Sequence, residues 1–261
     1  MTERISWTRQ QLLVAFNLYC RLPFGRLHSR NPEIIKYADL IGRTPSALAM
    51  KLTNIASLDP VITATGRKGL KGASKADKLM WEEMHNNWDD FATESNQALN
   101  AIAGCNDLGT LEEKQLLADE IDYTGNVKPV LTNARIGQNF FRQAVLSAYN
   151  YRCCITGLSV PRLLIASHIV PWKNDETNRL NPRNGLSLSM LHDKAFDVGI
   201  ITINKDMTVR VSKQKQSVDD NFYTSALLHY DGKPIFLPDK FPPNADFLAY
   251  HREYIFENDT R

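Results

Sequence analysis

The amino-acid sequence predicts an α+β protein, in which a mainly helical N-terminal domain precedes a C-terminal domain that mixes strands and helices. Apolar residues recur at helical spacing through the first 75 positions, whereas short apolar strands separated by polar loops follow in the second half. A length of 261 residues suits two domains, and 43% hydrophobic with 23% charged residues is an ordinary globular composition. These observations exclude a disordered chain, a coiled coil and a collagen-like fibre.

Residues 1–75 are predicted to form the first domain, built from capped helices. Ser6 or Thr8 caps a first helix. Asn31-Pro32 begins a second helix that Gly42 ends, and Thr44-Pro45 begins a third. A helix, a glycine-containing turn and a second capped helix are typical of a helix-turn-helix.

Charge is distributed unevenly along the chain, although the net charge is only +2. Residues 1–75 carry 12 Lys and Arg against 4 Asp and Glu, residues 126–215 carry 13 against 5, and the intervening residues 76–125 carry 2 against 12. Two basic regions favour two surfaces for a polyanion such as DNA, because each neutralised phosphate releases counterions. Solvated helix faces would produce the same pattern.

If the third helix reads DNA, the candidate base contacts are Arg43, Ser46 and Lys51. The glycine-rich loop that follows, residues 66–74, contains Arg67 and Lys68 and could track a phosphate backbone. A flexible linker has the same composition.

Residues 76–125 are predicted to form an acidic helical connector. One long helical pattern covers residues 75–104, and a second helix covers Leu111 to Ile121. The connector is either a solvated segment that packs on one of the domains or an acidic surface that masks a basic groove until DNA displaces it.

Residues 126–261 are predicted to form the second domain, with a linker at residues 123–132. The expected elements, in chain order, are a helix at 136–149, strands at 163–166 and 186–188, a short helix at 191–198, a hairpin at 200–211, a helix at 217–230, a strand at 234–237 and a helix at 245–256.

The four cysteines, Cys20, Cys105, Cys153 and Cys154, show no repeated spacing and predict neither a disulfide framework nor a structural zinc site. No stretch reaches about 18 consecutive apolar residues, and the first 25 residues lack the continuous apolar core of a secretory signal. We therefore expect a cytoplasmic protein without a membrane partner.

Three residues suited to catalysis, His168, Asn184 and His192, lie across the predicted strand–loop–strand–helix unit. The segments around and before them are Arg135–Arg142, Cys153–Gly157, Ala166–Trp172, Asn184–Leu186 and Leu191–Asp197. In this combination the sequence resembles the HNH endonucleases, in particular the subgroup found in bacterial restriction-type proteins, over about residues 135–203.

The resemblance implies a ββα-metal finger that hydrolyses phosphodiester bonds with the help of a metal. It implies that His168 is the general base, and a neutral imidazole suits that role at neutral pH. It implies that Asn184 holds the loop that orients His168, and that His192 is a metal ligand.

One departure from the family concerns the metal. Many HNH enzymes carry Asp, Glu or His directly before the base, and this chain has Ser167. Asp193, Asp197, a water molecule or the phosphate itself must complete the ligand shell, and Asp193 and Asp197 are equally good candidates among them. The implied cofactor is one divalent cation, Mg²⁺ or Mn²⁺, although an imidazole ligand also tolerates Zn²⁺ or Ni²⁺.

The candidate phosphate contacts in this finger are Lys173, Arg179, Arg183 and Lys194. The expected function is a restriction-type endonuclease of modified or unmodified double-stranded DNA, whose N-terminal domain supplies DNA binding or specificity. The alternatives are an effector nuclease of a defence or toxin system, whose N-terminal domain binds a protein or a signal, and a non-catalytic DNA-binding regulator. Double-strand cutting would need a homodimer or two sequential nicks.

Overall fold

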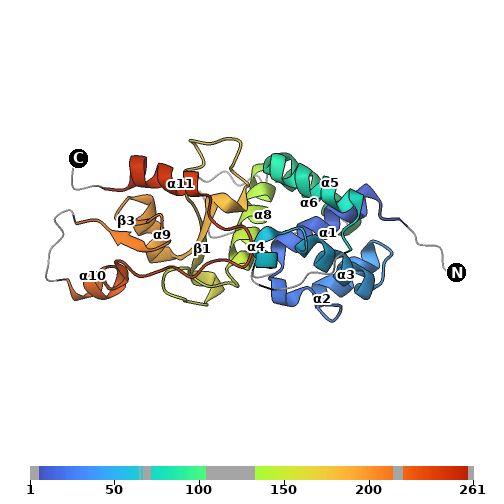
Figure 1. The fold of residues 1–261 in the computed structure, drawn as a ribbon, viewed down its shortest axis with the longest axis horizontal. Coiled ribbons are helices and arrows are strands. Elements are labelled where there is room, and N and C mark those ends of the chain that lie inside the picture. Colours follow the sequence, from blue (N-terminus) through green and yellow to red (C-terminus); the bar gives the residue numbers. More distant parts are fainter. Residues whose placement is uncertain (1–5, 65, 67–71, 104–132, 214–219, 258–261) are drawn as a thin grey trace, which may run out of the picture. The chain divides into compact units, whose positions relative to one another are not determined.

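A computed structural model of the chain describes residues 6–64, 66, 72–103, 133–213 and 220–257 (Figure 1). The chain divides into two compact units, residues 1–140 and 141–261. The protein is α+β: helices make up the described part of the first unit, and the second contains two antiparallel strand pairs. None of the helices in the described ranges is long and apolar enough to cross a membrane.

The first unit is arranged around one buried helix. Its elements are α1 (Arg9–Arg21), the 3-10 turn η1 (Phe24–Arg26), α2 (Pro32–Leu40), α3 (Pro45–Ala56), α4 (Pro60–Ala64), α5 (Lys75–Asn86) and α6 (Trp88–Ala103). Thr8 begins α1 through a capping box with Gln11. Every residue of α1 from Leu12 to Cys20 is buried, and the helix packs against α3, α5 and α6.

The second and third predicted helices are present as α2 and α3, which pack against each other. Asn31 caps α2 by accepting from the N–H of Glu33, and Thr44 caps α3 by accepting from the N–H of Ala47. Gly42 lies between the helices with a φ of +65°, a left-handed conformation that glycine adopts without strain. The caps read from the sequence therefore place both helices correctly.

The long helix predicted over residues 75–104 is wrong, because the chain breaks at Asn87 to form α5 and α6. Asn87 is extended, and its backbone N–H ends α5 by donating to Glu83 O. Its side-chain oxygen accepts from the N–H of Asp90 at 3.1 Å, which satisfies a donor at the start of α6. The second predicted acidic helix and the linker lie outside the described residues.

The described part of the acidic connector consists of α5 and α6, which pack against α1. Arg9 on α1 pairs with Glu83 on α5 and, at 2.7 Å, with Glu94 on α6. All three side chains are about half exposed, so each pair contributes modestly to stability.

Helix α8 (Asn133–Ala148) leads into the second unit, where the two strand pairs follow. The elements are η2 (Pro161–Leu163), β1 (Leu164–His168), η3 (Pro182–Asn184), β2 (Gly185–Ser189), α9 (Met190–Asp197), β3 (Ile201–Ile203), β4 (Val209–Val211), α10 (Asn221–Ala226), η4 (Leu228–Tyr230), α11 (Ala245–Tyr250) and the π-helical turn η5 (His251–Ile255). β1 pairs with β2, β3 pairs with β4, and α9 packs on β1, β2 and β3. The strand–loop–strand–helix unit predicted from the sequence is thus present.

Two tail predictions need correction. The single helix expected over residues 217–230 is divided into α10 and η4 by Leu227, whose φ and ψ of −123° and −59° leave the helical region. The strand expected at residues 234–237 does not form, because proline lacks an N–H and Pro234 makes only an isolated β-bridge to Thr208.

Candidate active site

The site is built on the β1–β2 hairpin, with α8 against one face. His168 pairs with Gly185 and Ser167 pairs with Leu186, so both residues lie at the end of β1 that enters the loop. A Cβ at Gly185 would lie 2.3 Å from Val145 Cγ2 and 2.9 Å from Phe141 Cζ, both on α8. The glycine therefore allows α8 to approach the hairpin beside His168.

The imidazole of His168 is held by two rings and one hydrogen bond. It stacks on Phe141, with centroids 3.9 Å apart and planes 7° apart, and meets Trp172 edge-on at 5.5 Å. Nε2 lies 2.9 Å from the carbonyl oxygen of Arg179. Because a carbonyl oxygen can only accept, Nε2 carries the proton and Nδ1 of the neutral ring keeps its lone pair.

The neutral form of His168 is favoured at physiological pH. Burial lowers the pKa of His168, and its hydrogen bond to the Arg179 carbonyl acts in the opposite direction. A neutral imidazole with a fixed proton on Nε2 can accept a proton at Nδ1. This is the chemistry that a general base requires.

Asn184 holds the loop between β1 and β2. It is buried, its Oδ1 accepts from the N–H of Val170 at 2.8 Å, and its Nδ2 donates to Val170 O at 3.2 Å. Its backbone carbonyl also accepts from the N–H of Ile169, the residue after His168. Asn184 therefore holds the backbone next to His168 in place, and its side-chain amide is used in hydrogen bonds to that loop.

His192 points into the interior of the second unit. It is 3% exposed, its Nδ1 lies 2.8 Å from Ser189 Oγ, and its ring meets Tyr230 edge-on at 5.5 Å. Burial lowers its pKa. Among the described residues, no three or more His, Cys, Asp and Glu side chains gather closely enough to hold a metal. His192 Nε2 is buried and has no hydrogen-bond partner of normal geometry in the described part of the chain, so the role of His192 as a metal ligand stays a prediction.

Asp193 lies near Ser167, and Asp197 follows one turn later on α9. Burial raises the pKa of Asp193, and the nearby Ser167 hydroxyl and Lys194 lower it. Burial raises the pKa of Asp197, and the charge of Asp193 raises it further. Ser167 is 2% exposed, and its Oγ is close enough to affect Asp193 but makes no hydrogen bond of normal geometry.

These three residues fit a divalent cation. Two neighbouring carboxylates repel each other, and a cation between them would relieve that repulsion. The unsatisfied Ser167 oxygen is a further donor, and hard oxygen donors suit Mg²⁺ or Mn²⁺. Three protein donors would leave further positions for water and phosphate.

The four basic candidates of the finger fall into two groups. Lys173 and Lys194 are exposed. Arg179 and Arg183 are half-buried and donate to backbone carbonyls, Arg179 to Trp172 at 2.9 Å and Arg183 to Pro242 at 3.3 Å. Only the two lysines present their charges to solvent without such bonds in the described structure.

The candidates of the first unit are also placed differently from one another. Ser46 is exposed in the first turn of α3. Arg43 donates to Ser6 O and to Gln11 Oε1, and its guanidinium lies 4.9 Å from the Trp7 ring centroid. Arg67 and Lys68 lie outside the described residues.

Lys51, predicted to contact a base, is buried instead. Its ammonium lies 2.8 Å from a carboxylate oxygen of Asp77, and the two side chains are 7% and 0% exposed. This corrects the prediction: the side chain is used inside the unit, because a buried charge needs its counter-ion.

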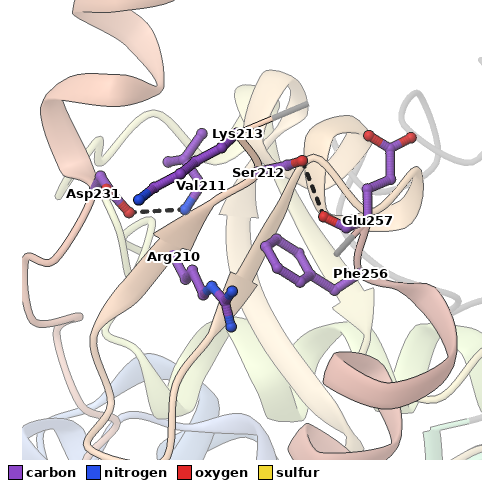
Figure 2. Close-up of a pocket in the computed structure, with 7 residues that line it drawn as sticks. All are labelled: Arg210, Val211, Ser212, Lys213, Asp231, Phe256 and Glu257. Atoms are coloured by element: carbon purple, nitrogen blue, oxygen red, sulfur yellow. Dashed lines mark hydrogen bonds between the residues drawn. The ribbon is translucent and has the colours of Figure 1, made fainter. Parts of the chain in front are cut away.

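A separate pocket of about 230 Å³ lies at the end of β4 (Figure 2). Its lining residues are Arg210, Val211, Ser212, Lys213, Asp231, Phe256 and Glu257. Several polar groups there already pair with one another: Asp231 accepts from the N–H of Val211 at 2.9 Å, and Ser212 donates to the carbonyl oxygen of Glu257 at 3.0 Å. It contains none of the predicted site residues.

Comparison with known proteins agrees with this geometry. Residues 153–204, which include β1, β2 and α9, match the family model described as HNH endonuclease. The finger is therefore that of a nuclease, a class of hydrolase. More specifically, the C-terminal half of this chain contains an HNH endonuclease domain.

Comparisons of the whole chain with curated proteins and with solved structures give little further information. No curated protein matches the chain. One similar solved structure is described as "Modification dependent TagI restriction endonuclease"; it is 20% identical, the match covers 43% of this chain and 36% of that chain, and the TM-score is 0.33. The match spans about a third of that protein's length.

The sequence did not single out Phe141, Trp172 or the Arg179 carbonyl as neighbours of His168. A usable signal was present: Phe141 and Val145 are four positions apart on one helix face, and Gly185 follows Asn184 directly.

Proposed function

We propose that this protein is a metal-dependent DNA endonuclease of the restriction type, whose HNH domain hydrolyses phosphodiester bonds in double-stranded DNA. The observation that carries the proposal is the hydrogen bond from His168 Nε2 to the Arg179 carbonyl, which leaves Nδ1 unprotonated. An imidazole held in this way takes the proton from a water molecule that attacks phosphorus. Asn184 keeps the adjoining loop in place and does not itself react.

One divalent cation, Mg²⁺ or Mn²⁺, is proposed to bind Asp193, Asp197 and Ser167. When bound, it supplies charge neutralisation on the phosphate and the leaving oxygen. His192, one position before Asp193, is proposed as a further ligand through Nε2, which is buried without a hydrogen-bond partner of normal geometry among the described residues, while Nδ1 lies against Ser189. The exposed lysines Lys173 and Lys194 contribute contacts to phosphate.

The first unit is proposed to bind the same DNA or to supply specificity. The support is the packed pair of helices α2 and α3, which suits a helix–turn–helix, and the exposed Ser46 at the start of α3. In this proposal, residues 1–75 are the DNA-binding domain, residues 76–125 the acidic connector and residues 126–261 the nuclease domain.

A plasmid-cleavage assay tests the nuclease proposal. With Mg²⁺ or Mn²⁺, the wild type should convert supercoiled DNA to nicked or linear product, and His168→Ala should reduce the rate by about 100-fold or more while DNA still binds. His28→Ala, which removes an exposed imidazole of the first unit, is the matched control. No cleavage by the wild type on unmodified, methylated or hydroxymethylated DNA would refute the proposal.

Calorimetric titration with Mn²⁺ in the absence of DNA tests the metal site. Asp193→Asn, Asp197→Asn and His192→Gln should each weaken Mn²⁺ binding by about tenfold or more. A variant that binds Mn²⁺ as tightly as the wild type would show that its residue is not a ligand. Linear product formed without accumulation of nicked DNA would support a homodimer, which sedimentation would check.

A further inference from the structure

The loop that joins β1 to β2 is folded around the side chain of Arg179. Its Nε donates to the carbonyl oxygen of Trp172 at 2.9 Å, and its guanidinium lies over the Trp172 ring, 5.3 Å from the centroid. Nη2 also pairs with Glu176 at 3.1 Å, but the Glu176 side chain is 80% exposed, so this ion pair contributes little. The side chain of Arg179 is therefore turned onto its own loop.

Arg179 contacts His168 directly through its backbone carbonyl and indirectly through Trp172. Its backbone carbonyl accepts the hydrogen bond from His168 Nε2 at 2.9 Å. Its guanidinium covers the ring of Trp172, and that ring meets the imidazole edge-on with planes at 90°. One residue thus holds the proton-bearing nitrogen of the base directly and the ring of the base through Trp172.

The backbone beside Arg179 is anchored independently of its side chain. The Asn178 side chain donates to Asp175 Oδ2 at 2.7 Å, and the Asn178 carbonyl accepts from Asn184 Nδ2 at 3.3 Å. On the other side of Arg179, Leu180 is buried. The fold of the loop therefore has support that would remain in an Arg179 variant, whereas the placement of Trp172 depends on the guanidinium.

We propose that Arg179 is a positioning residue for His168, and not a contact to DNA phosphate as its charge alone suggested. This inference rests on the proposed function, in which His168 is the general base. Without the guanidinium, Trp172 loses both its stacking partner and the donor to its carbonyl. The imidazole then loses the fixed ring beside it, although the Arg179 carbonyl stays in place, and the orientation of Nδ1 is no longer fixed.

Arg179→Ala separates the two roles, because positioning and phosphate binding change different measurements. Single-turnover cleavage with Mg²⁺ should slow by about 10-fold to 100-fold. The Kd for a DNA duplex, measured with Ca²⁺ by fluorescence anisotropy, should stay within about twofold, and its salt dependence should not change. A phosphate contact would weaken binding and reduce the salt slope by about 1. Lys173→Ala, an exposed cation in the same loop, should show that second pattern.

Two further measurements keep the inference falsifiable if Arg179→Ala is poorly folded. Arg179→Lys retains a donor for the Trp172 carbonyl and should recover part of the cleavage rate, and Trp172→Ala should lose as much as Arg179→Ala. In protein labelled with ¹⁵N-histidine, the hydrogen-bonded Nε2–H of His168 should give a protected signal in the wild type and exchange faster with water in Arg179→Ala, because Trp172 no longer fixes the imidazole against the Arg179 carbonyl.

The outcomes distinguish the inference from the proposed function. If the wild type cleaves and Arg179→Ala changes only Kd, the inference is refuted while the nuclease remains. If the wild type never cleaves, the nuclease proposal fails, and the Nε2–H signal still decides whether Arg179 positions His168. A signal that is unchanged in Arg179→Ala would overturn the inference in either case.

Discussion

His251 couples the stability of the second unit to pH, and its substitution by glutamine makes the coupling measurable. The ring is 1% exposed and stacks on Phe196 of α9, with centroids 3.6 Å apart. Nε2 donates to Phe196 O at 3.0 Å, and Nδ1 lies 2.8 Å from Thr202 Oγ1. Phe196 precedes Asp197, so His251 supports the helix that carries the proposed metal-binding carboxylates.

The size of this pH effect on stability follows from the pKa of His251. Burial lowers the pKa of His251 from 6.5 to about 4, with Arg252 acting in the same direction and the Phe196 carbonyl in the other. The unfolded state therefore binds more protons between these values, so this contribution to stability is present above pH 6.5 and is lost as pH falls to about 4. The whole gap corresponds to about 3 kcal/mol of unfolding free energy, of which about 2 kcal/mol disappears between pH 7 and pH 5.

Urea unfolding at pH 7 and pH 5 provides the assay. Cys153 and Cys154 are 0% exposed, so their labelling by a disulfide reagent, located by mass spectrometry, reports unfolding of the second unit. His251→Gln keeps a donor for Phe196 O and an acceptor for Thr202 but cannot be protonated. The variant should therefore lose about 2 kcal/mol less than the wild type between the two pH values. Equal losses in the two proteins would refute the reasoning, and His28→Gln should behave as the wild type because its ring is exposed.

Two further predictions concern packing. Lys51→Met leaves the buried carboxylate of Asp77 without its cationic partner, so the free energy of unfolding of the first unit in urea should fall by about 3–5 kcal/mol. Unchanged stability together with weakened DNA binding would show instead that Lys51 acts as a surface contact to DNA. Gly185→Ala places a Cβ 2.3 Å from Val145 and 2.9 Å from Phe141, so it should cost about 1–3 kcal/mol and slow cleavage by displacing the ring under His168. Thermal unfolding and single-turnover kinetics check the second variant, and wild-type values in both would contradict the packing argument.

Local signals predicted most helix starts and the core of the finger, because those features depend on neighbouring residues. Thr8, Asn31 and Thr44 cap the helices that they were expected to cap, since a cap acts on backbone N–H groups two or three positions away. The break at Asn87 was missed because the apolar spacing continues through it. Apolar periodicity alone does not predict that the Asn87 side chain ends one helix and begins the next.

Sequence reasoning failed where a side chain depends on a distant partner. Lys51 was expected to contact a base, but its ammonium is buried against Asp77, which lies 26 positions away. Arg179 was read as a loop cation because its charge is visible in the sequence. Its contacts with Trp172 and His168 come from the path of the loop, which composition does not specify.

The sequence by itself determined that His168, Asn184, His192 and two aspartates lie on a strand–loop–strand–helix unit, because alternation and capping are local properties. Tertiary structure decided which atom can act as the base, since only the position of the Arg179 carbonyl places the proton on Nε2. It also decided that Asp193 meets Ser167 while its neighbour His192 meets Tyr230. Consecutive helical residues point about 100° apart, and only the packing of α9 determines which direction faces the site.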